Sequence, residues 1–181
     1  MFEYDGAQLD AYADWSSEAR RVREEYGTEC VPYVKELVAF DNTSANGLGT
    51  PLPAGQLQYY GGASKHEVSM TDDRIGHTPE GAAIRVDIGN AEGLVGDREC
   101  TGFDIDRDNR RIDESFRITL RNHLEEQATV RVVEHLYRAA NWKIDKASAD
   151  YHKVDDQAIE FPVTVDRDGE ATITYTVHYE W

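Results

Sequence analysis

The C-terminal part of the chain alternates strictly between apolar and polar residues. Every second residue is apolar in 159–165 and again in 173–179, and 116–121 repeats the pattern over a shorter run. Successive side chains of a strand point to opposite faces of a sheet, so alternation leaves one face buried and one in water. This pattern is typical of antiparallel sheets, and it predicts an antiparallel β core. His178 falls on the polar side of the last run and is expected to be exposed.

Weaker strand signals precede this region and are separated by turn signals. Strands are predicted at 33–40, 56–60, 67–70, 82–88, 99–105 and 130–135. In 130–135 the alternation slips by one position, which indicates a bulge. Asn46-Gly47 is a strong turn signal inside the long loop 41–55.

The last two strands are joined by a short turn, and one of them carries a proline. The segment 166–169 predicts a hairpin in which Gly169 adopts a positive φ. Pro162 lacks an amide donor, so its strand is expected to lie at a sheet edge or to contain a bulge. About ten short strands with little helix predict an all-β fold, an antiparallel β-sandwich over 31–181, with an open β-barrel as the alternative.

Residues 1–30 follow a helical pattern instead. Apolar residues recur with helical spacing at Trp15, Ala19, Val22 and Tyr26. A short helix is therefore predicted over 15–27, with Ser16 or Ser17 as its cap and Gly27 as its end. We expect 1–30 to form a partly helical N-terminal segment.

The chain is acidic, with 35 Asp and Glu against 19 Lys and Arg and a net charge of −16. Phosphate backbones and anionic membrane surfaces would be repelled, so nucleic acid is not expected as a partner. The acidic surface either attracts cations and basic partners, or keeps the protein soluble or adapted to a salty medium. The sequence has no run of about 18 apolar residues, so direct membrane insertion is not expected. The first residues lack the apolar core of a signal peptide, and the compartment of the parent protein stays open.

Several segments occur together in a recognisable order. They are Phe40-Asp41-Asn42-Thr43, Asn46-Gly47-Leu48-Gly49, Arg74-Ile75-Gly76-His77, Ile88-Gly89-Asn90-Ala91, Leu120-Arg121-Asn122-His123 and Asn141-Trp142-Lys143-Ile144. Over 31–181 this order resembles the C-terminal half of a family of conserved bacterial proteins of unknown function related to the mucoidy-inhibitor-A-like proteins. The resemblance implies an all-β domain of a longer polypeptide, exported or in the cell envelope, and it supplies no catalytic residues. Glu92-Gly93 departs from the family, which usually has Phe-Asp there.

One acidic loop suggests a metal site. Asp104, Asp106 and Asp108 alternate like the first ligands of a calcium loop, and they are our candidate calcium ligands. Asn109 occupies the position at which an EF-hand requires glycine, and Ser115 the position of the bidentate glutamate. A solvated loop between two strands is the competing interpretation.

Exposed loops are the candidate interaction surface. We select Asn46 and Leu48 in the long loop, Tyr60 in the following strand, and His77 in a Gly-His-Thr-Pro turn. Loops held on a rigid scaffold commonly carry binding residues. His77 can act as a ligand or a general base, or its ring can tie two loops together by hydrogen bonds.

The sequence holds no recognisable catalytic motif. It has no GxSxG, HExxH or CxxC element, and neither Cys30 nor Cys100 lies beside a histidine or a positive cluster. The two cysteines can form one disulfide or stay as two thiols. We therefore expect a non-catalytic structural or protein-interaction module, without cofactors, that contacts a protein partner or other domains of its own polypeptide. The alternatives are a calcium-binding module and a hydrolase with a site assembled from distant residues.

Overall fold

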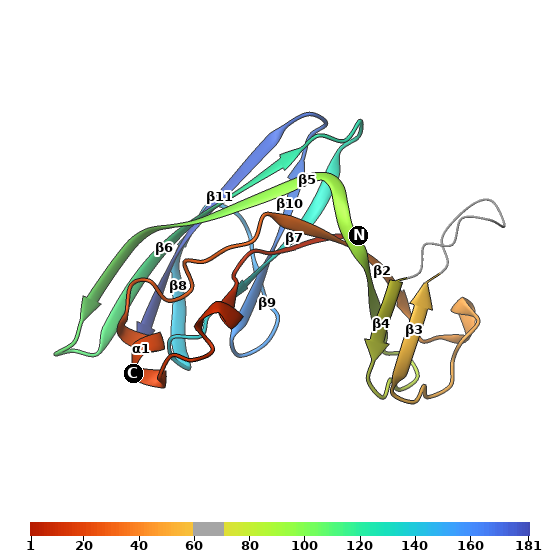
Figure 1. Ribbon diagram of the computed structural model, residues 1–181, viewed down its shortest axis with the longest axis horizontal. Coiled ribbons are helices and arrows are strands. Elements are labelled where there is room, and N and C mark those ends of the chain that lie inside the picture. The colour runs from red at the N-terminus through yellow and green to blue at the C-terminus, as the bar shows by residue number, and fades with distance from the viewer. Residues whose placement is uncertain (60–70) are drawn as a thin grey trace. The chain divides into compact units, whose positions relative to one another are not determined.

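The computed structural model describes residues 1–59 and 71–181, and it is mostly β, with 57% of residues in strands and 8% in helices (Figure 1). The all-β prediction is confirmed. A large mixed sheet has the strand order β8-β11-β6-β5-β2-β1-β7-β10-β9, and β3 pairs with β4 in a second sheet. No closed barrel forms among the described residues, and the fold fits a sandwich.

The element bounds follow the sequence pattern closely in the C-terminal part. The strands are β1 (Phe2–Asp5), β2 (Tyr33–Asp41), β3 (Gly55–Tyr59), β4 (Thr71–Ile75), β5 (Ala83–Asp106), β6 (Arg111–Asn122), β7 (Ala128–His135), β8 (Asn141–Ala147), β9 (His152–Lys153), β10 (Ala158–Val165) and β11 (Glu170–Glu180). The helical elements are η1 (Leu9–Tyr12), α1 (Ser17–Val22) and η2 (Ser44–Asn46). The strand predicted at 67–70 lies outside the described residues. In the part of the chain that the structure describes, no helix is long and apolar enough to cross a membrane.

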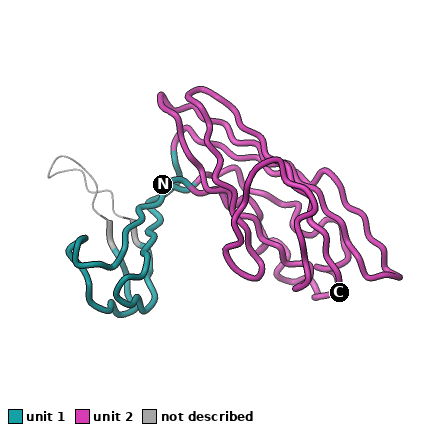
Figure 2. Tube along the Cα trace, turned by 180° about the vertical axis from the view of Figure 1, so that it is seen from behind, with its two compact units in different colours: residues 1–2, 35–91 teal, residues 3–34, 92–181 magenta. Residues whose placement is uncertain are grey.

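The chain divides into two compact units (Figure 2). Unit 1 comprises residues 1–2 and 35–91, and unit 2 comprises residues 3–34 and 92–181. The long strand β5 belongs to both units. Its two ends were predicted as separate strands, but they are joined through Gly89 and Gly93, whose φ angles of 122° and 89° favour glycine.

Unit 1 is organised by one buried asparagine. The side-chain amide of Asn42 donates to the carbonyls of Thr50 (2.8 Å) and Pro79 (3.0 Å), and its carbonyl oxygen accepts from the Gly49 amide (3.0 Å). These bonds tie the loop after β2 to the turn before β5. Gly47 closes η2 at φ 75°, so the predicted Asn-Gly turn is confirmed.

Unit 2 contains the predicted antiparallel core. β6 pairs with β5 and β11, β11 also pairs with β8, and β10 pairs with β7 and β9. Phe161 on β10 lies 5.6 Å from Tyr175 on β11, although these strands are not neighbours in the sheet. The Tyr175 ring in turn stacks on Phe116 at 5.2 Å. The two ends of the strand order therefore pack face to face, and the alternating apolar residues fill the space between them.

The edge prediction for Pro162 is confirmed, and the hairpin prediction is half right. β9 pairs only with Ile159 and Glu160, so the outer side of β10 at Pro162 has no ladder partner among the described residues. The Gly169 amide donates to the Asp166 carbonyl at 3.0 Å, which closes the turn. The left-handed residue, however, is Asp168 (φ 49°), a type that tolerates this conformation.

The N-terminal helix is real but shorter than predicted. Ser16 caps it, because its hydroxyl accepts from the Ala19 amide at 3.1 Å. The helix ends at Val22, and Arg23 is already extended with ψ 132°, so the predicted end at Gly27 is wrong. Gly27 instead adopts φ 77° in the turn that follows.

Candidate functional site

The N-terminal segment of unit 2 and the residues just after β7 enclose a groove of about 700 Å³. We call it the N-terminal groove. It is lined by Leu9, Asp10, Ala13, Trp15, Ser17, Arg20, Arg21, Tyr26 and Tyr137. Its volume falls within the range of small-ligand and peptide-anchor sites, about 300–1,000 Å³.

Aromatic rings form one part of this groove. Tyr12 packs edge-on against Trp15 and Tyr26, with 5.1 Å between ring centroids in each case. Trp15 and Tyr26 came from the predicted helical stripe, but they meet because the helix ends early and the chain turns back. The Tyr12 hydroxyl accepts from the Glu29 amide at 2.8 Å and lies 3.3 Å from Thr28 Oγ1. These bonds fix the aromatic cluster to the end of the segment.

Arginines form the other part. The Nε atoms of Arg20 and Arg21 are buried and have no hydrogen-bond partner. Arg20 Nη2 donates to the Ala13 carbonyl, and the Arg23 guanidinium lies 5.5 Å from the Trp15 ring centroid. A buried donor without a partner is costly, and a bound acceptor would relieve that cost.

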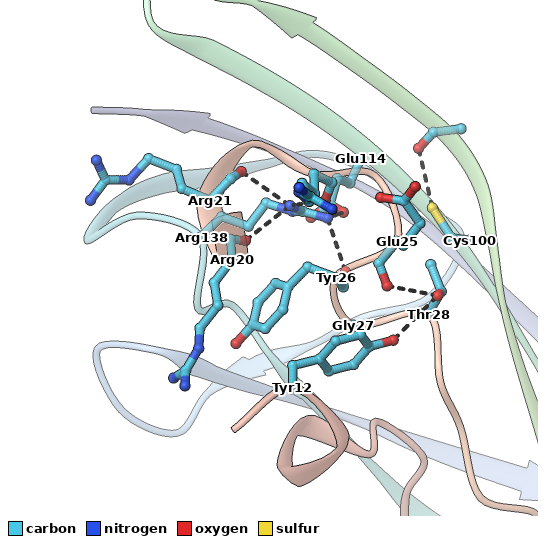
Figure 3. Close-up of polar contacts among 12 residues, drawn as sticks. Tyr12, Arg20, Arg21, Glu25, Tyr26, Gly27, Thr28, Cys100, Glu114 and Arg138 are labelled. Carbon is cyan, nitrogen blue, oxygen red and sulfur yellow. Dashed lines mark hydrogen bonds and ion pairs between the residues drawn. The ribbon is translucent and has the colours of Figure 1, made fainter. Parts of the chain in front are cut away.

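A buried arginine holds this segment to the sheet. Arg138 pairs with Glu114 on β6 at 2.6 Å, and both side chains are at most 4% exposed. Its Nη1 donates to the main-chain carbonyls of Arg20, Arg21 and Arg23 at 2.9–3.1 Å. Figure 3 shows the carbonyls of Arg20 and Arg21 directed at Arg138, while the side chains of these two residues extend away from it. The last carbonyls of a helix lack internal partners and favour a cation, so Arg138 caps α1.

A second buried arginine acts in the same way. Arg98 Nε donates to both carboxylate oxygens of Glu134 at 2.9–3.0 Å, and its Nη1 donates to the Gly27 carbonyl at 2.6 Å. The Tyr175 hydroxyl donates to the same carboxylate at 2.5 Å. Glu134 is fully buried, and its charge is satisfied by these bonds. These bonds hold the chain at Gly27 to the sheet.

Sequence reasoning missed both ion pairs, although one signal was present. The apparent slip in 130–135 is Glu134 at an inward position, and β7 pairs with β10 in a continuous register. Glu114 likewise occupies an inward position between Ile112 and Phe116. A charged residue at a position that the period assigns to the core was the available clue.

A carboxylate, an imidazole and a phenol form a chain beside the groove. Asp5 Oδ2 lies 2.8 Å from His135 Nε2, and His135 Nδ1 lies 2.8 Å from the Tyr137 hydroxyl. The hydrogen bond with Asp5 raises the pKa of His135, and burial raises the pKa of Tyr137. Both shifts favour the protonated forms of His135 and Tyr137. These hydrogen bonds therefore orient the Tyr137 ring in the groove wall.

The predicted calcium ligands do not gather in one place. Asp104 and Asp106 lie on β5, and Asp108 lies in the following turn. Asp106 accepts from the amide and the side chain of Asn109 at 2.9 Å and 2.6 Å, which closes the turn and lowers the pKa of Asp106. The competing interpretation, a solvated loop, fits this geometry.

A different group of ligand types converges elsewhere in unit 2. Within residues 1–59 and 71–181, a metal-sized cluster is formed by Asp113, Asp145 and His178. His178 is only 4% exposed, so its predicted exposure is wrong. Its Nδ1 lies 2.6 Å from Asp113 Oδ1 on the neighbouring strand, which accounts for a buried imidazole on the polar side of β11.

The predicted interaction residues lie in unit 1. Asn46 is exposed and donates to the Asp41 carbonyl at 2.9 Å, Leu48 is half-buried, and His77 is exposed. Asn42 brings the loops of Asn46 and His77 together, whereas Tyr60 lies outside the described residues.

The two cysteines are free thiols, each partly buried. Of the states left open by the sequence, the structure therefore has the unpaired one. Burial raises the pKa of the Cys100 thiol, which disfavours the reactive thiolate.

Comparison of the chain with protein-family models, curated proteins and solved structures found no match.

Proposed function

We propose that the protein is a non-catalytic binding module, and that its N-terminal groove binds an acidic peptide segment of a protein partner. One observation carries this proposal: a groove of about 700 Å³ joins aromatic rings to Arg20 and Arg21, whose buried Nε donors have no partner. Guanidinium groups recognise carboxylates with directed, charge-assisted hydrogen bonds.

Charge supports an acidic ligand. The chain carries a net charge of −16, but the groove lining holds two arginines against Asp10 and is net positive. A basic peptide would offer the arginines no carboxylate and would be repelled by their positive charge. An acidic peptide supplies acceptors, and its apolar groups can pack on Trp15 and Tyr26.

The scaffold supports binding rather than catalysis. Arg98 and Arg138 fix the segment by hydrogen bonds to its main chain, so little ordering is required when a ligand binds. The hydrolase alternative has one specific observation in its favour, the Asp5–His135–Tyr137 chain. The raised pKa of Tyr137 keeps its phenol protonated and makes it a poor nucleophile.

The resemblance to the C-terminal half of the conserved bacterial family related to the mucoidy-inhibitor-A-like proteins belongs to this proposal too. It favours a module of a longer, exported polypeptide, whose other domains are then candidate partners.

The test is binding of matched peptide sets by calorimetry. Eight-residue peptides carrying one aromatic residue and several Asp, Asn or Lys residues should bind in the order acidic, neutral, basic. Arg21→Gln removes one charge-assisted contact and should weaken the best peptide by about 10- to 100-fold. Arg117→Gln is the control, because Arg117 forms an exposed ion pair with Glu99.

Two results would overturn the proposal. One is the absence of binding by every acidic peptide to a protein that folds normally. The other is equal weakening by Arg21→Gln and Arg117→Gln, which would assign the effect to net charge instead of the groove.

A further inference from the structure

We propose that Asp113, Asp145 and His178 form a binding site for a divalent transition-metal cation of the zinc type. Their ligand atoms all lie within 4.8 Å of one another. The site rests on different residues from those of the N-terminal groove, so either proposal can fail without the other.

Three neighbouring strands build the site. His178 on β11 lies directly opposite Asp113 on β6 and opposite Lys143 on β8. The register of β8 against β11 shifts between Thr176 and Val177, and the shift leaves Asp145 as the unpaired residue of a bulge. Bulges re-aim side chains and are frequent beside functional sites. Here the bulge brings a second carboxylate to the imidazole.

The histidine is held as a metal-binding imidazole usually is. Its side chain is 6% exposed, and Nδ1 faces Asp113 at 2.6 Å. Nε2 faces Glu180 Oε1 at 3.5 Å. With the cation at Nδ1, Glu180 would orient the ring through Nε2, as outer carboxylates commonly do for metal-bound histidines.

The ligand types select the metal. One imidazole and two carboxylates suit zinc and its neighbours, whereas calcium requires about six to eight oxygens. Zinc lies about 2.0–2.2 Å from nitrogen and oxygen ligands, which sets neighbouring ligand atoms about 3.4 Å apart. The 2.6 Å between His178 Nδ1 and Asp113 Oδ1 must therefore widen when both atoms bind one cation. Asp113 and Asp145 are 42% and 39% exposed and have room to rotate.

Lys143 competes with the cation. Its Nζ lies 3.0 Å from Asp145 Oδ1, and its side chain is 65% exposed. An exposed ion pair contributes little, so a metal can displace the lysine at small cost. Removing the lysine should therefore tighten metal binding, which a purely structural role of the cluster does not predict.

The experiment titrates zinc into the full chain without a histidine tag, followed by calorimetry and by thermal unfolding. We expect one zinc per chain and, at about one hundred times the dissociation constant, a rise in Tm of about 5–10 °C. Asp145→Asn should weaken binding at least about tenfold, because it removes an exposed ligand. Lys143→Met should tighten binding about two- to fivefold.

The double variant Asp106→Asn and Asp108→Asn is the matched control, and its zinc affinity should equal that of the wild type. Asp104 is left in place because it pairs directly with Asp113. Absence of saturable zinc binding, or equal affinity in wild type and Asp145→Asn, would overturn the proposal. So would a loss of binding in the double variant alone, which would place the cation at the β5–β6 turn.

Discussion

Arg138→Met tests the claim that one buried cation holds the N-terminal segment to the sheet. Methionine keeps much of the side-chain volume and removes the guanidinium. The change deletes the 2.6 Å pair with Glu114 and the bonds to the carbonyls of Arg20, Arg21, Arg23 and Tyr26.

The largest cost is the stranded carboxylate of Glu114. Removing one partner of a buried ion pair typically destabilises a protein by about 3–5 kcal/mol. Burial raises the pKa of Glu114, so the carboxylate can take up a proton instead. The pKa of Glu114 in the folded protein lies above its pKa in the unfolded chain. The cost of the unpaired Glu114 charge is therefore small near the unfolded pKa, and it grows as pH rises towards the folded pKa. The destabilisation should therefore be larger at pH 8 than at pH 5.

Urea unfolding monitored by tryptophan fluorescence and far-UV circular dichroism provides the measurement. Adding Glu114→Leu to Arg138→Met should recover part of the loss, because it removes the unpaired charge. The reasoning would be refuted if Arg138→Met cost less than about 1 kcal/mol, or if the double variant were no more stable than the single one.

Three further changes probe other parts of the fold. His135→Gln should lower Tm most below about pH 6.5, because the His135 pKa is raised by Asp5 and its stabilisation is lost as pH rises through the folded value; a pH-independent loss of Tm would contradict this. Asn42→Ala should destabilise unit 1 by about 2–3 kcal/mol, seen as faster amide exchange there, and unchanged exchange would argue against its role as a hub. Phe161→Ala should cost about 3–5 kcal/mol in urea unfolding, since Phe161 is fully buried, and a cost below about 1 kcal/mol would show that the two layers do not pack there.

The alternation of apolar and polar residues located the strands reliably where the inward positions are apolar. It succeeded in β10 and β11, whose buried residues match the alternation apart from Ala158 and His178. At Glu134 it predicted a bulge that is absent from the pairing with β10, because a charged residue at an inward position interrupts the apolar pattern. The partner that makes this burial tolerable, Arg98, lies 36 residues away, and sequence spacing alone cannot reveal such a pair.

The candidate sites were harder to predict for the same reason. The helical stripe correctly singled out Trp15 and Tyr26, but their contact depends on an early helix end. That end is set by Arg138, which lies 112–118 residues from its carbonyl partners. The acids of 104–108 attracted notice because they are adjacent in sequence, whereas the cluster around His178 is assembled across strands.

Arg138 also accounts for how so short a helix can persist. Isolated helices below about 12–15 residues are marginal in water, and α1 has only six residues. Its stability must therefore come from tertiary contacts, and these reach its main-chain carbonyls more than its side chains. Contacts to the main chain leave the Arg21 side chain free of a structural role on that face, whereas the Arg20 side chain bonds to the Ala13 carbonyl. The N-terminal groove can consequently change its side chains, and hence its ligand, without loss of the segment that carries them.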